Sequence, residues 1–281
     1  VSCMSGKYMA YVGSYSYTGK AKGITVFDVD VENGMFKERC EIEVDNSSYV
    51  IASSDGKTLY SIADEGVVSF RILPNGSLAR LNSSSIRGMR GCHLCTDEED
   101  KYVFVSGYHD GKTTVLNLNP DGSVGKIVDG VFDRGYGSVA ERNFRPHVTC
   151  TRRMPDNRFV LSVDNGIDQV KIYRFNDKEQ KLVQVDAIRC DLESAPRHFR
   201  YSKDGKFIYL MYELKKAIEV YTYKTGDRAP VIEKIQTIST TSTKNPDNLT
   251  AACAMRMSID QKYIYCTNAG ENTISVYKRD E

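Results

Sequence analysis

The stretch APRHFRYSKDGKFIYLMYELKKAIEVYTY, residues 195–223, decides the fold of this protein. Apolar residues recur in KFIYLMY and AIEVYTY with a period of two, which is the period of β-strands rather than of helices. Asp204 and Gly205 provide a tight turn between the first two strands. The stretch therefore predicts a short antiparallel meander.

The same pattern recurs along the chain as a strand, a turn with an acidic residue, and two further strands. Its copies have their turn residues at Asp55, Glu99, Asp156, Asp204 and Asp260. The resulting spacing of roughly 44 to 57 residues is close to the length of a propeller blade. Turns such as DVENG and NPDGS lead to a fourth strand, so each repeat predicts a four-stranded antiparallel sheet.

We therefore expect an all-β fold, a single β-propeller domain over residues 1–281. Its blade-like repeats are expected at about 8–46, 47–87, 88–143, 144–193, 194–246 and 247–281. The first repeat lacks one strand and the last ends inside its third strand, which leaves two exposed sheet edges. The chain continues beyond Glu281, or a partner covers the gap, or the ring closes by another pairing. Self-association is one way to cover an open ring.

The composition favours a small-molecule partner. Thirty-eight basic and 37 acidic residues give a net charge of +1, too little to attract a nucleic acid or a membrane surface. We found no signal-peptide pattern and no run of 18 apolar residues, so we expect a cytoplasmic protein.

The pattern of cysteines also favours the cytoplasm. The eight cysteines lack the regular spacing of a disulfide scaffold and are expected to be free thiols. Cys92 and Cys95 have CxxC spacing, but on a strand they point to opposite faces and no second pair follows. We therefore expect no metal and no cofactor.

Several segments carry a family likeness. YMAYVGSYS, RPHVTC, APRHFRYSKDGKFIYLMYEL and RMSIDQKYIYCTNAGENTISVY resemble the lactonase family of seven-bladed propellers. That family includes a bacterial type of 6-phosphogluconolactonase and the fungal carboxymuconate cyclases. The resemblance spans nearly the whole chain. It implies a seven-bladed propeller that is C-terminally incomplete in this chain, with about five and a half blades present.

The resemblance also implies a catalytic group. His147 matches a histidine of the family's PHxH stretch, Arg197 the arginine of PRH, and Glu213 the glutamate of NEL. Two positions depart from the pattern, since Thr149 stands at the second histidine and Ala269 at the arginine of SNRG. These departures favour altered or lost activity.

Hairpin geometry supports the pairing of Arg197 with Glu213. Antiparallel pairing is expected to put Arg197 opposite about Met211, with Glu213 one step further on the same face. Lactone hydrolysis needs a base, here His147 or Glu213, and a cation to stabilise the oxyanion. The bland alternative is a surface ion pair without a chemical role.

Further residues are expected around the same rim. The propeller arrangement places Asp110, His93 and Asn165 near it as well. The predicted substrate-binding residues are His198, Arg256, Arg145, Asp164 and Asn268.

A second basic feature comes from the repeat itself. Arg152, Arg200 and Arg256 each lie four residues before a turn aspartate, so they recur at one position in three repeats. Either neighbouring blades satisfy these side chains, or they form a basic column that binds a ligand.

The leading function is metal-independent hydrolysis of a small anionic lactone or sugar acid derivative, by default 6-phosphogluconolactone to 6-phosphogluconate. One alternative is an intramolecular lyase that cyclises a carboxymuconate-type diacid. The other is an inactive propeller that serves as a binding module, since propellers carry many unrelated functions.

Overall fold

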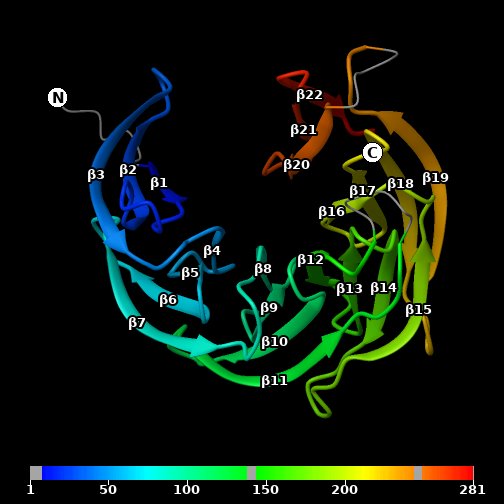
Figure 1. Ribbon diagram of the computed structural model, residues 1–281, viewed down its shortest axis with the longest axis horizontal. Coiled ribbons are helices and arrows are strands. Elements are labelled where there is room, and N and C mark those ends of the chain that lie inside the picture. Colours follow the sequence, from blue (N-terminus) through cyan, green and yellow to red (C-terminus); the bar gives the residue numbers. More distant parts are fainter. Residues whose placement is uncertain (1–7, 138–143, 244–248, 281) are drawn as a thin grey trace. The chain divides into compact units, whose positions relative to one another are not determined.

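The computed structural model describes residues 8–137, 144–243 and 249–280. These residues form β-strands and turns, and no helix occurs among them. Their strands build six antiparallel sheets in chain order (Figure 1). Within each sheet, strands that follow one another in the chain pair with one another, which confirms the predicted meander.

The chain divides into two compact units. The first unit comprises residues up to 105 and residues 114–127, and the second comprises residues 106–113 and 128 onward. The first sheet has three strands, β1 (Tyr8–Gly13), β2 (Gly23–Asp30) and β3 (Met35–Glu43). The second has four, β4 (Val50–Ala52), β5 (Thr58–Ala63), β6 (Gly66–Ile72) and β7 (Leu78–Ser85).

The third sheet contributes residues to both units. Its strands are β8 (His93–Thr96), β9 (Tyr102–Ser106), β10 (Lys112–Leu118) and β11 (Val124–Phe132). The fourth sheet, in the second unit, consists of β12 (Val148–Arg153), β13 (Phe159–Asp164), β14 (Gln169–Arg174) and β15 (Val183–Arg189).

The last two sheets also belong to the second unit. One has four strands, β16 (Pro196–Tyr201), β17 (Phe207–Tyr212), β18 (Ala217–Lys224) and β19 (Val231–Ser239). The other has three, β20 (Ala251–Met257), β21 (Tyr263–Ala269) and β22 (Thr273–Lys278). The first strands of these sheets are neighbours, since β16 contacts both β12 and β20.

Acidic side chains close the turns between first and second strands. Asp204 Oδ1 accepts the Lys206 N–H, and Asp55, Asp156 and Asp260 accept an N–H two residues on in the same way. In the third sheet Glu99 lies in the turn as predicted, and the carboxylate that accepts an N–H there is that of Asp97. The reason is geometric, because a carboxylate at the start of that turn reaches the N–H of Lys101.

Apolar side chains fill the space between neighbouring sheets. In the second unit, Phe159 and Leu161 of β13 pack with Phe199 and Leu210 of the next sheet in one buried cluster. All six residues of β13 are buried, because both faces of this strand are covered. Burial on both faces explains why β13 reads as an apolar run rather than as strict alternation.

Three bulges shape the first strands of the second unit. Pro196 pairs with Tyr212 and His198 with Met211, so Arg197 is an extra residue between two ladder pairs. Thr149 and Cys253 are the extra residues at the same position of β12 and β20. The predicted register, with Arg197 opposite Met211, was therefore wrong. A bulge inserts a residue without changing the apolar pattern, so the sequence gives no signal of it.

Candidate active site at the ends of β12, β13, β16 and β17

Arg197 and Glu213 form an ion pair. The Nη1 of Arg197 lies 3.3 Å from Oε2 of Glu213, and the side chains are 34% and 13% exposed. The backbone fixes both residues, because the Glu213 N–H donates to the Ala195 carbonyl at 2.8 Å, just before the bulge. A partly exposed pair held on a rigid hairpin end is accessible to a ligand.

Asn165 connects this pair to the neighbouring sheet. Its side-chain amide donates to Oε2 of Glu213 at 3.2 Å, and its backbone N–H donates to the carbonyl of His147 at 2.8 Å. Asn165 follows β13 directly, as Glu213 follows β17. The sequence places Asn165 near the rim but gives no reason to pair it with Glu213, which is 48 residues away.

His147 is almost completely buried, at 3% exposure. Its ring stacks on that of Tyr108 with a centroid distance of 4.1 Å, and Nδ1 lies 2.5 Å from the Tyr108 carbonyl oxygen. A carbonyl oxygen only accepts, so Nδ1 carries the hydrogen and donates it. In the neutral ring, Nε2 is then the nitrogen with the free lone pair.

Asp164 organises the backbone around His147. Its Oδ1 accepts the N–H groups of His147, Gly166 and Ile167 at 2.9 to 3.1 Å, and the residue is fully buried. These contacts use the carboxylate as an internal anchor for the loop. Asp164 thus acts through the backbone rather than facing a ligand.

Asp133 lies against Asp164. Burial, together with a hydrogen bond to Asp164 and the negative charge of that residue, raises the pKa of Asp133 to about 8. The charge of Lys171 and a hydrogen bond from Tyr173, whose hydroxyl donates to Oδ1 at 3.3 Å, lower it in part. This shift favours the protonated form of Asp133 beside Asp164 at neutral pH.

The remaining predicted residues lie in different surroundings. Partial burial, followed by the charges of Arg197, Arg152, Arg256 and Arg200, lowers the pKa of His198 well below its ordinary value. Arg145 is exposed, with its guanidinium over the ring of Phe144.

Asn268 is 3% exposed, and its amide donates to the Thr240 carbonyl at 2.6 Å. Arg256 lines a cavity at the other end of β20.

The two departures from the family pattern have structural consequences. Thr149 Oγ1 donates to the carbonyl of Arg197 at 2.7 Å, so this hydroxyl bridges the bulges of β12 and β16. Ala269 ends β21 and pairs with Ala251. Its methyl group offers no charge at the position equivalent to Glu213.

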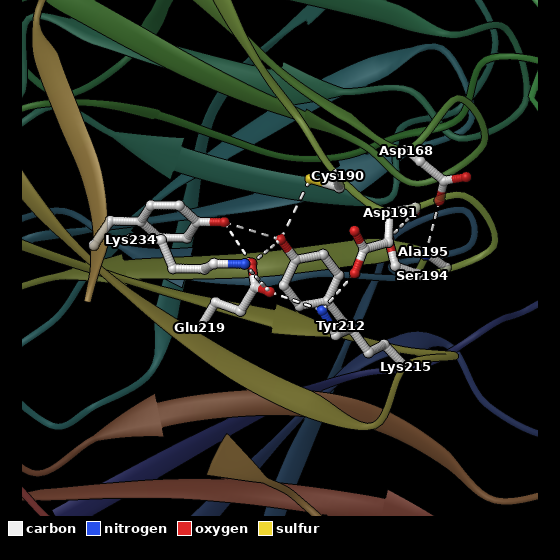
Figure 2. Close-up of polar contacts among 10 residues, drawn as sticks. Asp168, Cys190, Asp191, Ser194, Ala195, Tyr212, Lys215, Glu219 and Lys234 are labelled. Atoms are coloured by element: carbon white, nitrogen blue, oxygen red, sulfur yellow. Dashed lines mark hydrogen bonds and ion pairs between the residues drawn. The ribbon is translucent and has the colours of Figure 1, made fainter. Parts of the chain in front are cut away.

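A second polar cluster surrounds the hydroxyl of Tyr212, the residue before Glu213 (Figure 2). Glu219 accepts hydrogen bonds from the hydroxyls of Tyr212 and Tyr221 at 2.6 and 2.5 Å. It also contacts Lys215 Nζ at 2.8 Å and Lys234 Nζ at 3.3 Å. Burial raises the pKa of Glu219, but these hydrogen bonds outweigh it and lower the pKa to about 2.

This cluster braces the chain segment before Arg197. Lys215 also binds Asp191 at 2.7 Å, and Asp168 accepts the N–H groups of Glu193 and Ala195. Figure 2 shows Asp168 in contact with Ala195, and Lys215 in contact with both Asp191 and Glu219. Burial raises the pKa of the Cys190 thiol to about 12, so this cysteine is inert at neutral pH.

Three further observations concern metal ligands, cysteines and membrane-spanning helices in the described part of the chain. No group of three His, Cys, Asp or Glu side chains there is arranged to hold a metal ion. Cys92 and Cys95 form no disulfide, and neither do the other cysteines in that part. None of its segments is a helix that could cross a membrane.

Within each compact unit, antiparallel sheets of up to four strands follow one another with their first strands in contact, and this arrangement defines an all-β propeller. A family model described as "Lactonase, 7-bladed beta-propeller" matches residues 9–281, and the chain belongs to this family.

Named relatives agree with the family. The 6-phosphogluconolactonase of Bacillus subtilis is 30% identical over 278 residues, which cover 97% of this chain and 78% of that protein. A solved structure from Bacteroides fragilis, provisionally named a 6-phosphogluconolactonase, is 28% identical with a TM-score of 0.85 and covers 100% of this chain and 80% of its own. The periplasmic gluconolactonase of Pseudomonas aeruginosa, at 23% identity and a TM-score of 0.86, covers 98% and 79% and shares the fold.

Proposed function

We propose that this protein hydrolyses a small lactone, with 6-phosphogluconolactone as the first substrate to test. The observation that carries the proposal is the partly exposed Arg197–Glu213 pair with Asn165 fixed against it. Membership of the lactonase family and the relative in Bacillus subtilis support the same reaction class. An arginine fork and a carboxylate base are sufficient for ester hydrolysis.

The proposed roles follow from the contacts. Glu213 takes a proton from a water molecule, and the water oxygen bonds to the lactone carbonyl carbon. Arg197 stabilises the oxyanion that forms. The bond between that carbon and the ring oxygen then breaks, and the proton held by Glu213 passes to the ring oxygen. Asn165 donates to Oε2 of Glu213 and thereby positions the carboxylate.

His147 is proposed as a supporting group. Its Nδ1 is committed to the Tyr108 carbonyl, so Nε2 is the nitrogen able to accept a proton. Its deep burial favours positioning over direct contact with water. Arg145, which is exposed, is the proposed contact for an anionic group of the substrate.

The remaining predicted binding residues receive other roles. Asp164 and Asn268 are proposed to give structural support, because Asp164 accepts backbone N–H groups and the Asn268 amide donates to the Thr240 carbonyl and to two neighbouring hydroxyls. His198 is proposed to stay neutral beside the arginines.

The decisive experiment compares R197M and E213Q with the unchanged protein in lactone hydrolysis, after subtraction of spontaneous hydrolysis. Each variant is expected to lose about 10²- to 10³-fold in kcat/KM. R90Q is the matched control, because Arg90 pairs with Asp64 at 3.1 Å in another sheet. Unchanged kinetics in R197M and E213Q would remove the site assignment, and a larger loss in H147Q than in E213Q would make His147 the base.

The same variants also distinguish the lactonase from a lyase and from a binding module. A carboxymuconate-type diacid replaces the lactone in a cyclisation assay, and turnover there alone would assign the lyase function. Anion binding without turnover of either substrate would indicate a binding module.

We also propose that the native ring has seven blades. The family model has seven blades, and the relatives above are longer, since this chain covers 78–80% of them. In this proposal all of the blade-like repeats belong to a single propeller domain. The intact mass of the native protein tests it, and a 31.6 kDa monomer with full activity would contradict it. We propose the cytoplasm as the compartment, which suits cysteines that form no disulfide among the described residues.

A further inference from the structure

A cavity of about 270 Å³ lies at the turn ends of the first strands in the second unit. Arg152, Arg200 and Arg256 line it, together with Ser258 and Gln261 from the turn after β20. Arg200 lies three residues beyond Arg197 along β16, which corresponds to about 10 Å of strand. The cavity is therefore separate from the Arg197–Glu213 pair.

The three arginines occupy one register position. Arg152 pairs with Leu161, Arg200 with Tyr209 and Arg256 with Tyr265, in each case the fourth residue after the one that precedes the bulge. Neighbouring first strands thus bring three guanidinium groups to one cavity. Their recurrence follows from the repeat, but only the contacts of β12, β16 and β20 make them converge.

The electrostatics of the cavity favour an anion. The residues that line it include three arginines and no carboxylate. Arg152 is 8% exposed, so its charge acts through a medium that screens it weakly. Together with burial, these arginines lower the pKa of His198, so that histidine adds no positive charge at neutral pH.

Two contacts orient the arginines. Nε of Arg152 donates to the carbonyl of Phe199 at 3.1 Å, and Nη1 of Arg256 donates to the carbonyl of Met255 at 3.0 Å. Arg256 and Ile259 are exposed, so the cavity opens to solvent. Arginine forks bind tetrahedral oxyanions through paired hydrogen bonds, and the Ser258 hydroxyl and Gln261 amide are suitable additional donors.

We propose that this cavity binds a phosphate group, at a site distinct from the candidate active site. Its volume is slightly below that of typical small-molecule pockets, which favours a small ligand such as inorganic phosphate or a short phosphate monoester. Bound phosphate joins the first strands of three sheets through their arginines. Its binding is therefore expected to stabilise the folded protein.

Calorimetric titration of inorganic phosphate into the full chain at low salt tests the proposal. R200M and R256M are each expected to weaken binding about tenfold or more, because each removes a charge-assisted contact but keeps much of the side-chain length. K262M is the control, since Lys262 is an exposed cation on the same turn, and its affinity should change less than twofold. An equal affinity in all four proteins, or no binding to the unchanged chain, overturns the site.

A second arm distinguishes the sources of the phosphate group. Titration with 6-phosphogluconate and with gluconate shows whether an ester is accepted, and R197M shows which site holds it. Binding kept in R197M and lost in R256M supports the proposal, whereas the opposite result contradicts it. Circular dichroism confirms that each variant is folded. These titrations need no turnover, so this site and the lactonase proposal fail independently.

Discussion

Asn165 and Glu213 lie at the same position of neighbouring sheets, one residue after the second strand, and the amide of the first donates to the carboxylate of the second at 3.2 Å. The same position of the repeat thus holds an asparagine in the fourth sheet and a glutamate in the fifth. Their contact links the end of β17 to the end of β13 in the neighbouring sheet. Arg197 completes the group from the bulge on β16.

We predict that N165A lowers kcat of lactone hydrolysis about tenfold, with a small change in KM. The amide fixes one oxygen of Glu213, and its loss lets the carboxylate rotate toward Arg197 alone. The free energy of unfolding should fall by about 1 kcal/mol. N119A, at a turn in another sheet, controls for loss of an amide, and equal kinetics in the two variants would contradict the positioning role.

We predict that G166A unfolds at clearly lower denaturant concentration, by at least about 2 kcal/mol. A Cβ on Gly166 would meet the Arg145 carbonyl oxygen at 1.7 Å and the His147 ring at 2.9 Å, so the backbone before β12 must move. G56N is the comparison, because Gly56 has open space around it and Asn tolerates its positive φ of 69°. Similar stabilities for both variants would show that the loop adapts freely.

We predict that D133N is more stable than the unchanged protein at pH 8, by about 1 kcal/mol or more. Folding raises the pKa of Asp133 to about 8, so native Asp133 keeps a proton that the unfolded chain releases above about pH 4. Its stability contribution is complete below pH 4 and is lost as the pH rises toward 8. An amide donates to Asp164 without taking up a proton.

The difference between D133N and the unchanged protein should therefore grow from pH 4 to pH 8. Thermal unfolding at several pH values measures it. D227N is the control, because the Asp227 side chain is fully exposed. A difference independent of pH would exclude the shared proton.

We predict that E219Q destabilises the protein by about 1–3 kcal/mol at pH 7, because solvent screening reduces the free energy that corresponds to its lowered pKa. Folding lowers the pKa of Glu219 from 4.5 to about 2. Its contribution is present above pH 4.5 and is lost as the pH falls toward 2. Denaturant unfolding at pH 7 and pH 3 checks this, with E233Q on the exposed face of β19 as control. An equal loss at both pH values would contradict the ionic role.

Residue patterns predicted the sheet composition well. The period of two in KFIYLMY predicts β17, and the recurrence of the turn aspartates predicts successive antiparallel sheets. Arg197 and Glu213 were also paired from sequence, because the two ends of one hairpin must meet. The strand pattern and the hairpin pairing depend on residues that are close together in the sequence, so the sequence alone can predict them.

The tertiary structure alone decided the surroundings of the candidate site. The bulge at Arg197, the Asn165 contact to Glu213 and the Tyr108 carbonyl at His147 join residues about 40 to 50 positions apart or alter register without changing the pattern. The proton between Asp133 and Asp164 arises only where two carboxyl groups are buried together. Sequence fixes which side chains alternate along a strand, whereas the packing of sheet against sheet decides which of them meet and in which charge state.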